Sequence, residues 1–217
     1  ERFARELGAV RAALGLDEVV LYGHSWGTIL AVVYLTGLGG GAQPSGVRGA
    51  ILAGPSLSIP RWTADSRRLM AALPPDLGAT IEEGERTGRT DTEAFQAATH
   101  TYYQHYVCLL DPWPPELEAA FAGMGAQVYG TMNGPTEFTT TGPLKDVDVT
   151  GKLTELHLPL LFVCGEYDEA TPESTRAYAE LASGSLTVIE GASHCANLDQ
   201  PNAYMVALRD WLDAQGL

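Results

Sequence analysis

The sequence contains a serine between two glycines, in the run Gly23-His24-Ser25-Trp26-Gly27. A serine hydroxyl is a poor nucleophile at neutral pH, so it needs a base to take its proton. It also needs hydrogen-bond donors for the oxygen of the carbonyl group that it attacks. Flanking glycines allow a sharp turn that exposes the serine at the start of a helix. The run therefore predicts Ser25 as a nucleophile and the backbone N–H of Trp26 as an oxyanion donor.

An acid and a histidine follow in the chain order that such a turn requires, serine first, then acid, then histidine. Asp168 and His194 each come shortly after an apolar run that is typical of a buried strand. Since parallel strands end at the same edge of a sheet, we expect both side chains to meet Ser25 there. His194 is predicted to be the general base and Asp168 the group that orients it. We expect the side chain of His24 to point away from the position of the base.

Strands and helices alternate at both ends of the chain, which predicts a parallel sheet flanked by helices. The middle has Pro-Pro pairs, aromatic clusters and no strand alternation, so it is expected to be an inserted helical cap. Together with the catalytic order, this indicates an α/β-hydrolase fold. We expect residues 1–55 and 151–217 to form the hydrolase core and residues 56–150 the cap. The predicted elements are an amphipathic helix at 2–15, strands at 19–22, 47–53, 158–164 and 186–189, helices at 28–35 and 172–182, and a last helix after Pro201.

Composition argues against several other classes of function. The chain has 217 residues, of which 45% are hydrophobic and 18% charged, enough for one substantial core. A formal net charge of −14 disfavours nucleic acids and anionic membrane surfaces, which would repel it. The three cysteines have neither disulfide-framework nor zinc-site spacing, so we expect reduced thiols, a cytoplasmic protein, and no metal or cofactor.

Several phrases of the sequence resemble the proline iminopeptidase family, which includes aminopeptidases that act beside the tricorn protease. The resemblance runs from residue 23 to the C-terminus, and its cap phrases are more specific than the three catalytic residues. It implies hydrolysis that releases a free N-terminal residue, often proline, from a peptide. The matching phrases are Gly-His-Ser-Trp-Gly-Thr at 23–28, Tyr-Tyr-Gln-His-Tyr-Val-Cys and Asp-Pro-Trp-Pro within 102–114, Met-Asn-Gly-Pro-Thr-Glu-Phe at 132–138, Gly-Glu-Tyr-Asp-Glu-Ala-Thr-Pro at 165–172, and Ser-His at 193–194.

The resemblance also implies roles for two glutamates. Glu137 and Glu169 match carboxylates that in the family hold the α-ammonium group of the substrate. Paired carboxylates in a partly dry pocket would bind such a cation and exclude blocked N-termini. Tyr129, Phe138 and Trp113 are candidates for the apolar wall of the pocket, or for the core of the cap.

Two departures from the family pattern bear on these expectations. The family phrase His-Val-Cys-Arg is replaced by Tyr-Val-Cys-Leu at 106–109, which leaves a preference for proline open. Relatives also begin with several strands and a His-Gly-Gly-Pro-Gly loop that supplies the second oxyanion donor, and this sequence has no such loop. A strand at 19–22 would then have an unpaired edge, which natural proteins avoid. We therefore expect an N-terminal segment or a companion chain to complete the sheet.

Two alternatives stay open at this stage. The first is a hydrolase or acyltransferase of the same fold that acts on an amino-acid amide or ester in a small-molecule pathway. The second is a non-catalytic binding module with a hydrolase-like fold, which the missing oxyanion loop would explain. A substrate panel separates the first from an aminopeptidase, and labelling of Ser25 by a fluorophosphonate would exclude the second.

Overall fold

Four parallel strands form the centre of the protein in a computed structural model that describes residues 2–38 and 44–217. They lie in the order β1-β2-β3-β4, which is also their order in the chain, and each neighbouring pair is parallel. The predicted parallel sheet is therefore confirmed, with strand ends within two residues of the expected ones. The strands are β1 (Val19–His24), β2 (Val47–Ala53), β3 (Leu160–Gly165) and β4 (Ser185–Ile189).

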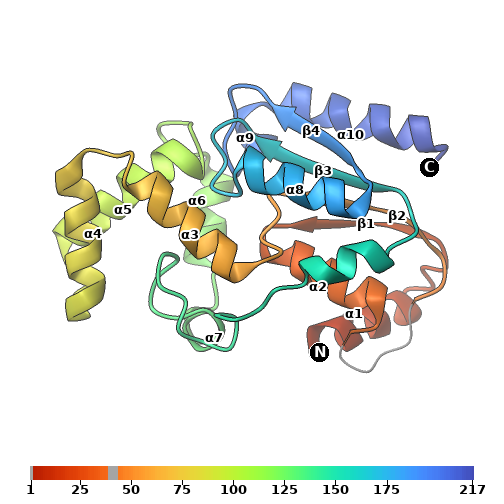
Figure 1. Ribbon diagram of the computed structural model, residues 1–217, viewed down its shortest axis with the longest axis horizontal. Helices are drawn as coiled ribbons and strands as arrows, with labels where there is room; N and C mark the ends of the chain where they lie inside the picture. The colour runs from red at the N-terminus through yellow and green to blue at the C-terminus, as the bar shows by residue number, and fades with distance from the viewer. Residues whose placement is uncertain (1, 39–43) are drawn as a thin grey trace.

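Helices cover both faces of this sheet (Figure 1). One face packs against α2, the short 3₁₀ helix η1 and α8, and their core includes Val32, Leu153, Phe162 and Tyr178. The other face packs against α9 and α10 through Tyr204, Leu208 and Trp211. Because β3 is buried along its whole length, it reads in the sequence as a continuous apolar run. The bounds are α2 (Trp26–Thr36), η1 (Thr150–Glu155), α8 (Pro172–Ala182), α9 (Ala196–Asp199) and α10 (Pro201–Gln215).

The first helix differs from its prediction in length and in burial. It spans Arg2–Ala13 as α1 and ends before Gly15, which has the left-handed φ of 63° that stops helices. Its apolar side chains stay substantially exposed, 36% for Phe3 and 52% for Val10. Among the described residues α1 packs on α2, where the ring centres of Phe3 and Trp26 are 5.2 Å apart in an edge-to-face arrangement. No helix in the described ranges is long and apolar enough to cross a membrane.

The segment between β2 and η1 contains five α-helices that extend to one side of the sheet (Figure 1). Its own core contains Ile81, Phe95, Tyr102 and Phe138. Where the segment begins and ends, the Ser58 hydroxyl donates to Asp148 at 2.8 Å. This is the expected inserted helical cap. Its helices are α3 (Ile59–Met70), α4 (Pro75–Thr87), α5 (Glu93–Tyr106), α6 (Pro115–Ala122) and α7 (Ala126–Met132).

Candidate active site

Ser25 lies at the turn between β1 and α2, as the glycine pattern predicts. Its φ of 52° and ψ of −123° are rare for a residue with a side chain, and such strain is typical of functional turns. A Cβ atom on Gly23 would lie 2.5 Å from the backbone oxygen of Gly27, so position 23 requires glycine. A Cβ on Gly27 would meet nothing within 4 Å, so the contacts of the described residues do not require this second glycine. Trp26 opens the helix, where backbone N–H groups have no partner within the helix.

Asp168 and His194 lie together in the loops that follow β3 and β4. The Nδ1 atom of His194 is 2.8 Å from Oδ1 of Asp168, and both side chains are buried. Asp168 is fixed in turn by backbone N–H groups, from Ala170 to Oδ1 at 2.7 Å and from Gly165 to Oδ2 at 3.3 Å. Since Asp168 accepts the hydrogen bond from Nδ1–H, Nε2 of His194 is the nitrogen left free to act as a base.

Ser25 joins this pair at the same edge of the sheet without a hydrogen bond to it. Its backbone N–H donates to the oxygen of Ala53 at 2.9 Å, and the next residue, Gly54, lies against the His194 ring. The hydrogen bonds of the described residues do not include one between Ser25 Oγ and His194. Catalytic contacts of this kind commonly shorten only when substrate binds.

The charge of Asp168 prepares His194 to accept a proton. Burial disfavours the charged imidazolium, but the charge and hydrogen bond of Asp168 outweigh burial, with a smaller contribution from Glu137. The pKa of His194 is therefore raised above its ordinary value. A base of higher pKa stabilises the proton that it takes from a serine hydroxyl.

His24 corrects one prediction, because its ring packs against His194 instead of pointing away. The two ring centres are 4.6 Å apart, and Nε2 of His24 lies 3.0 Å from the backbone oxygen of His194. Burial and then the neighbouring His194 lower the pKa of His24 to about 4. His24 is therefore neutral near pH 7 and donates Nε2–H to that carbonyl oxygen. Periodicity could not reveal this contact, since it joins residues 170 positions apart.

Tyr106 and Asp199 bind the loops of the site to the cap through hydrogen bonds. The sequence did not indicate this role for either residue. The backbone oxygen of Tyr106, at the end of α5, accepts N–H groups from His194 at 3.0 Å and from Glu169 at 3.4 Å. Asp199 accepts from the backbone N–H and hydroxyl of Ser193 at 2.7 and 2.6 Å, and from the N–H of Leu109 at 2.8 Å. The loop that carries His194 is thus fastened to the end of α5 and to the residues after it.

Glu137 and Glu169 lie close to each other near this site. Glu169 is 1% exposed, while Glu137 is half-buried and reaches the cavity beside Ser25. Burial raises the pKa of Glu169 well above its ordinary value, and the negative charges of Glu137 and Asp168 add to this effect. A buried acid in this state, with the carboxylate of Glu137 nearby, favours a cation that can neutralise its charge.

The cavity that contains Ser25 and Glu137 has a volume of about 370 Å³. Tyr129 lines it, as predicted for the pocket wall. Phe138 is instead part of the cap core, and Trp113 packs on Tyr103 in another cluster and is not a lining residue. Most of the remaining wall is apolar and comes from α1, α2, α3 and α7, including Phe3, Trp26, Ile59, Trp62, Val128 and Met132.

Comparison with known proteins agrees with this fold. Residues 1–201 match the model of the family described as the alpha/beta hydrolase fold, which defines the class of protein. The proline iminopeptidase of Heyndrickxia coagulans is 41% identical over 216 residues, covering 99% of this chain and 73% of that protein. The proline iminopeptidase of Lactobacillus delbrueckii subsp. bulgaricus is 34% identical, covering 99% and 72%. The chain belongs to the proline iminopeptidase family of α/β-hydrolase enzymes.

Solved structures give the same result. The crystal structure of VinJ superposes with a TM-score of 0.92 at 33% identity, covering 98% of this chain and 72% of that one. Proline iminopeptidase from Mycobacterium smegmatis superposes with a TM-score of 0.88 at 30% identity, covering 98% and 71%. Because the chain belongs to an enzyme family, a non-catalytic binding module is no longer supported as an alternative.

Proposed function

We propose that the protein is a serine aminopeptidase that releases an N-terminal proline or another small apolar residue from peptides through an acyl-enzyme. The observation that carries the proposal is that Ser25 and Glu137 line the same cavity. An aminopeptidase must recognise a cationic amine at a fixed distance from the carbonyl group that it attacks. A nucleophile and a carboxylate facing one cavity meet that requirement. The similarity to proline iminopeptidases supports the same class of substrate.

In the proposed reaction His194 takes the Ser25 proton at Nε2 as Oγ attacks the carbonyl carbon. The backbone N–H of Trp26 donates to the oxyanion that forms. When the C–N bond breaks, His194 gives the proton to the leaving amine, and the acyl group stays on Ser25. Water then attacks the ester with His194 again as base, which releases the amino acid. Asp168 accepts the hydrogen bond from Nδ1–H and stabilises the imidazolium in both steps.

The proposed amine site consists of Glu137 and Glu169. One carboxylate at the edge of the cavity and one buried beside it would neutralise the charge of an α-ammonium group. A substrate with an acylated N-terminus brings no positive charge and would leave two acids without a partner. The site should therefore discriminate against blocked N-termini.

A panel of anilides tests the proposal. Proline and alanine anilides should be cleaved and their N-acetyl forms refused, and Ser25→Ala should abolish turnover of all of them. Glu137→Gln should raise KM for free-amine anilides, whereas Glu118→Gln, an exposed acid of α6, should match the wild type. Equal cleavage of the N-acetyl forms would refute the aminopeptidase assignment.

The cavity wall favours a second candidate, an amino-acid amide or ester hydrolase or acyltransferase with a bulky apolar leaving group. A wall formed by Trp62, Val128 and Met132 gives a peptide backbone few hydrogen-bond partners but suits an apolar group. Competition between a dipeptide and an amino-acid amide of a long alkylamine decides between the two. A higher kcat/KM for the alkyl amide would favour the second candidate.

A further inference from the structure

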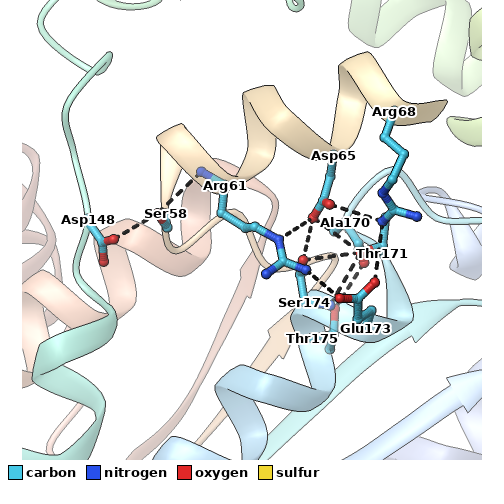
Figure 2. A network of polar contacts seen from close by, with 10 residues as sticks. All are labelled: Ser58, Arg61, Asp65, Arg68, Asp148, Ala170, Thr171, Glu173, Ser174 and Thr175. Atoms are coloured by element: carbon cyan, nitrogen blue, oxygen red, sulfur yellow. Dashed lines mark hydrogen bonds and ion pairs between the residues drawn. The ribbon is translucent and has the colours of Figure 1, made fainter. Parts of the chain in front are cut away.

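A buried carboxylate fastens the first cap helix to the hydrolase core (Figure 2). Asp65, on α3, is 4% exposed and accepts from Nε of Arg61 at 3.0 Å and from Arg68 at 3.0 Å. It also accepts from the hydroxyl of Thr171 at 3.3 Å and from that of Ser174. Thr171 and Ser174 begin α8, directly after the loop that carries Glu169. These contacts, which we call the Asp65 cluster, fix α3 against that loop.

The next residue of α3, Ser66, belongs to a group of buried polar atoms that lack partners. Four buried side-chain polar atoms of the described residues make no hydrogen bond, and three of them are Ser66 Oγ, Tyr102 OH and Glu169 Oε2. These three come from α3, α5 and the loop after β3. Ser66 and Glu169 are both close enough to the Tyr102 hydroxyl to influence its pKa. Buried polar groups normally have partners, and the three atoms lie close enough together to become partners of one another after a small shift.

We propose that Ser66 and Tyr102 form the inner wall of the amine-binding site and act as positioning residues for Glu169. The Tyr102 hydroxyl donates to the Glu169 carboxylate when a protonated primary or secondary amine is bound, and the Ser66 hydroxyl donates to the oxygen of Tyr102. The inference rests on the proposed function, because the ligand is the α-ammonium group of the substrate. It adds two residues that stabilise the charged form of the acid facing that group.

Protonation explains why such donors are needed. Burial raises the pKa of Tyr102 well above its ordinary value, so this hydroxyl keeps its proton and remains a donor. The pKa of Glu169 is also raised, so burial and the neighbouring acids disfavour its charged form, and a bound ammonium group must stabilise that form. A donor to the carboxylate lowers the cost of that ionisation. The titratable groups that interact with Glu169 or Tyr102 are Glu137, Asp168, Tyr103, Tyr129 and Cys195.

The experiment measures kcat and KM of alanine anilide between pH 5 and pH 9 for the wild type, Tyr102→Phe and Ser66→Ala. Loss of a hydrogen bond to a charged group should raise KM roughly ten- to a hundredfold for Tyr102→Phe, more than it lowers kcat. KM should fall as pH rises through the pKa of Glu169. In Tyr102→Phe this fall in KM should occur at higher pH, because loss of the donor raises the pKa of the carboxyl group. Ser66→Ala should show both changes to a smaller extent. Tyr178→Phe, which removes a buried hydroxyl from α8, serves as the matched control.

Two results separate this inference from the function on which it rests. If the wild type cleaves N-acetyl alanine anilide as well as alanine anilide, the proposed aminopeptidase activity itself is wrong. If the wild type requires the free amine, but both variants keep the wild-type KM and pH profile, the positioning role is overturned. Thermal unfolding shows which variants are folded, and Ser66→Ala, the smaller change, still tests the inference if Tyr102→Phe does not fold.

Discussion

Gly54 follows β2 and leaves the space that the His194 ring occupies. It has a φ of 50°, and a Cβ atom at this position would lie 2.7 Å from both Nδ1 and Cε1 of His194. Ordinary van der Waals contact begins near 3.4 Å, so Gly54→Ala should displace the imidazole or its loop by about 0.7 Å. Because Nδ1 is the atom bonded to Asp168, this displacement acts directly on the orientation of the base.

The expected loss can be estimated from that displacement. A misplacement of about 1 Å in a catalytic group costs about 100-fold in rate, so kcat/KM should fall roughly 30- to 100-fold. This corresponds to about 2–3 kcal/mol of activation free energy. An alanine with a left-handed φ also destabilises the fold by about 1–2 kcal/mol, and this second effect needs its own control.

Gly88→Ala supplies that control. Gly88 has a φ of 67° at the end of α4, and a Cβ there would meet nothing within 4 Å. Urea titrations should show that Gly88→Ala loses only the unfolding free energy due to the left-handed φ, and that Gly54→Ala loses at least as much because of its added clash. Only Gly54→Ala should lose kcat/KM on alanine anilide. If folded Gly54→Ala stays within about threefold of Gly88→Ala in kcat/KM, the steric argument is wrong.

Three further predictions follow from the charges and contacts of the site. Anilide turnover should decline as pH falls through the raised pKa of His194, because His194 must be neutral to act as a base. In the same assay Asp168→Asn should lower kcat about 10⁴-fold. His24→Phe should lower kcat about tenfold through loss of its bond to the His194 carbonyl, whereas a neutral His24 predicts no activity limb of its own between pH 5 and pH 8. Burial opposes the charge of Asp65, but its hydrogen bonds lower its pKa overall, so its charge stabilises the fold above the unfolded pKa and this contribution is lost as pH falls through the folded pKa. Urea unfolding should therefore show Asp65→Asn about 1–3 kcal/mol less stable than the wild type at pH 7, with a smaller difference in acid.

The parts of the fold that could be predicted are those that local sequence patterns determine. After the exposed Arg48, residues 49–53 form an apolar run that is buried throughout, and β2 has the predicted bounds. Thr171 and Pro172 mark the start of α8, where the Thr171 hydroxyl caps the helix. The order of Ser25, Asp168 and His194 was sufficient to place Asp168 and His194 together. In these cases a few neighbouring residues carry the signal.

The remaining features depend on contacts between distant residues. An apolar stripe on α1 shows which face could be buried but not what covers it, and Val10 is half exposed. The prediction for His24 failed because its ring direction depends on the carbonyl of His194. Gly54 leaves room for the ring of His194, and Asp199 accepts backbone N–H groups from Ser193 and Leu109. Neither contact has a sequence motif. The helical character of the cap was predictable, but the use of Tyr106 as a shared acceptor was not.

The bonds around Tyr106 have a consequence for how such enzymes can diversify. A lid on flexible hinges can be exchanged between relatives as a module, but this cap shares its backbone hydrogen bonds with the loop of the base. Val107 accepts the N–H of Cys195 at 2.7 Å, in addition to the bonds of Tyr106 and Leu109. A chimaera that imports a foreign cap must therefore import residues 106–109 and 193–199 as a matched pair. Changes of specificity by side-chain replacement inside the existing cap leave that pairing intact.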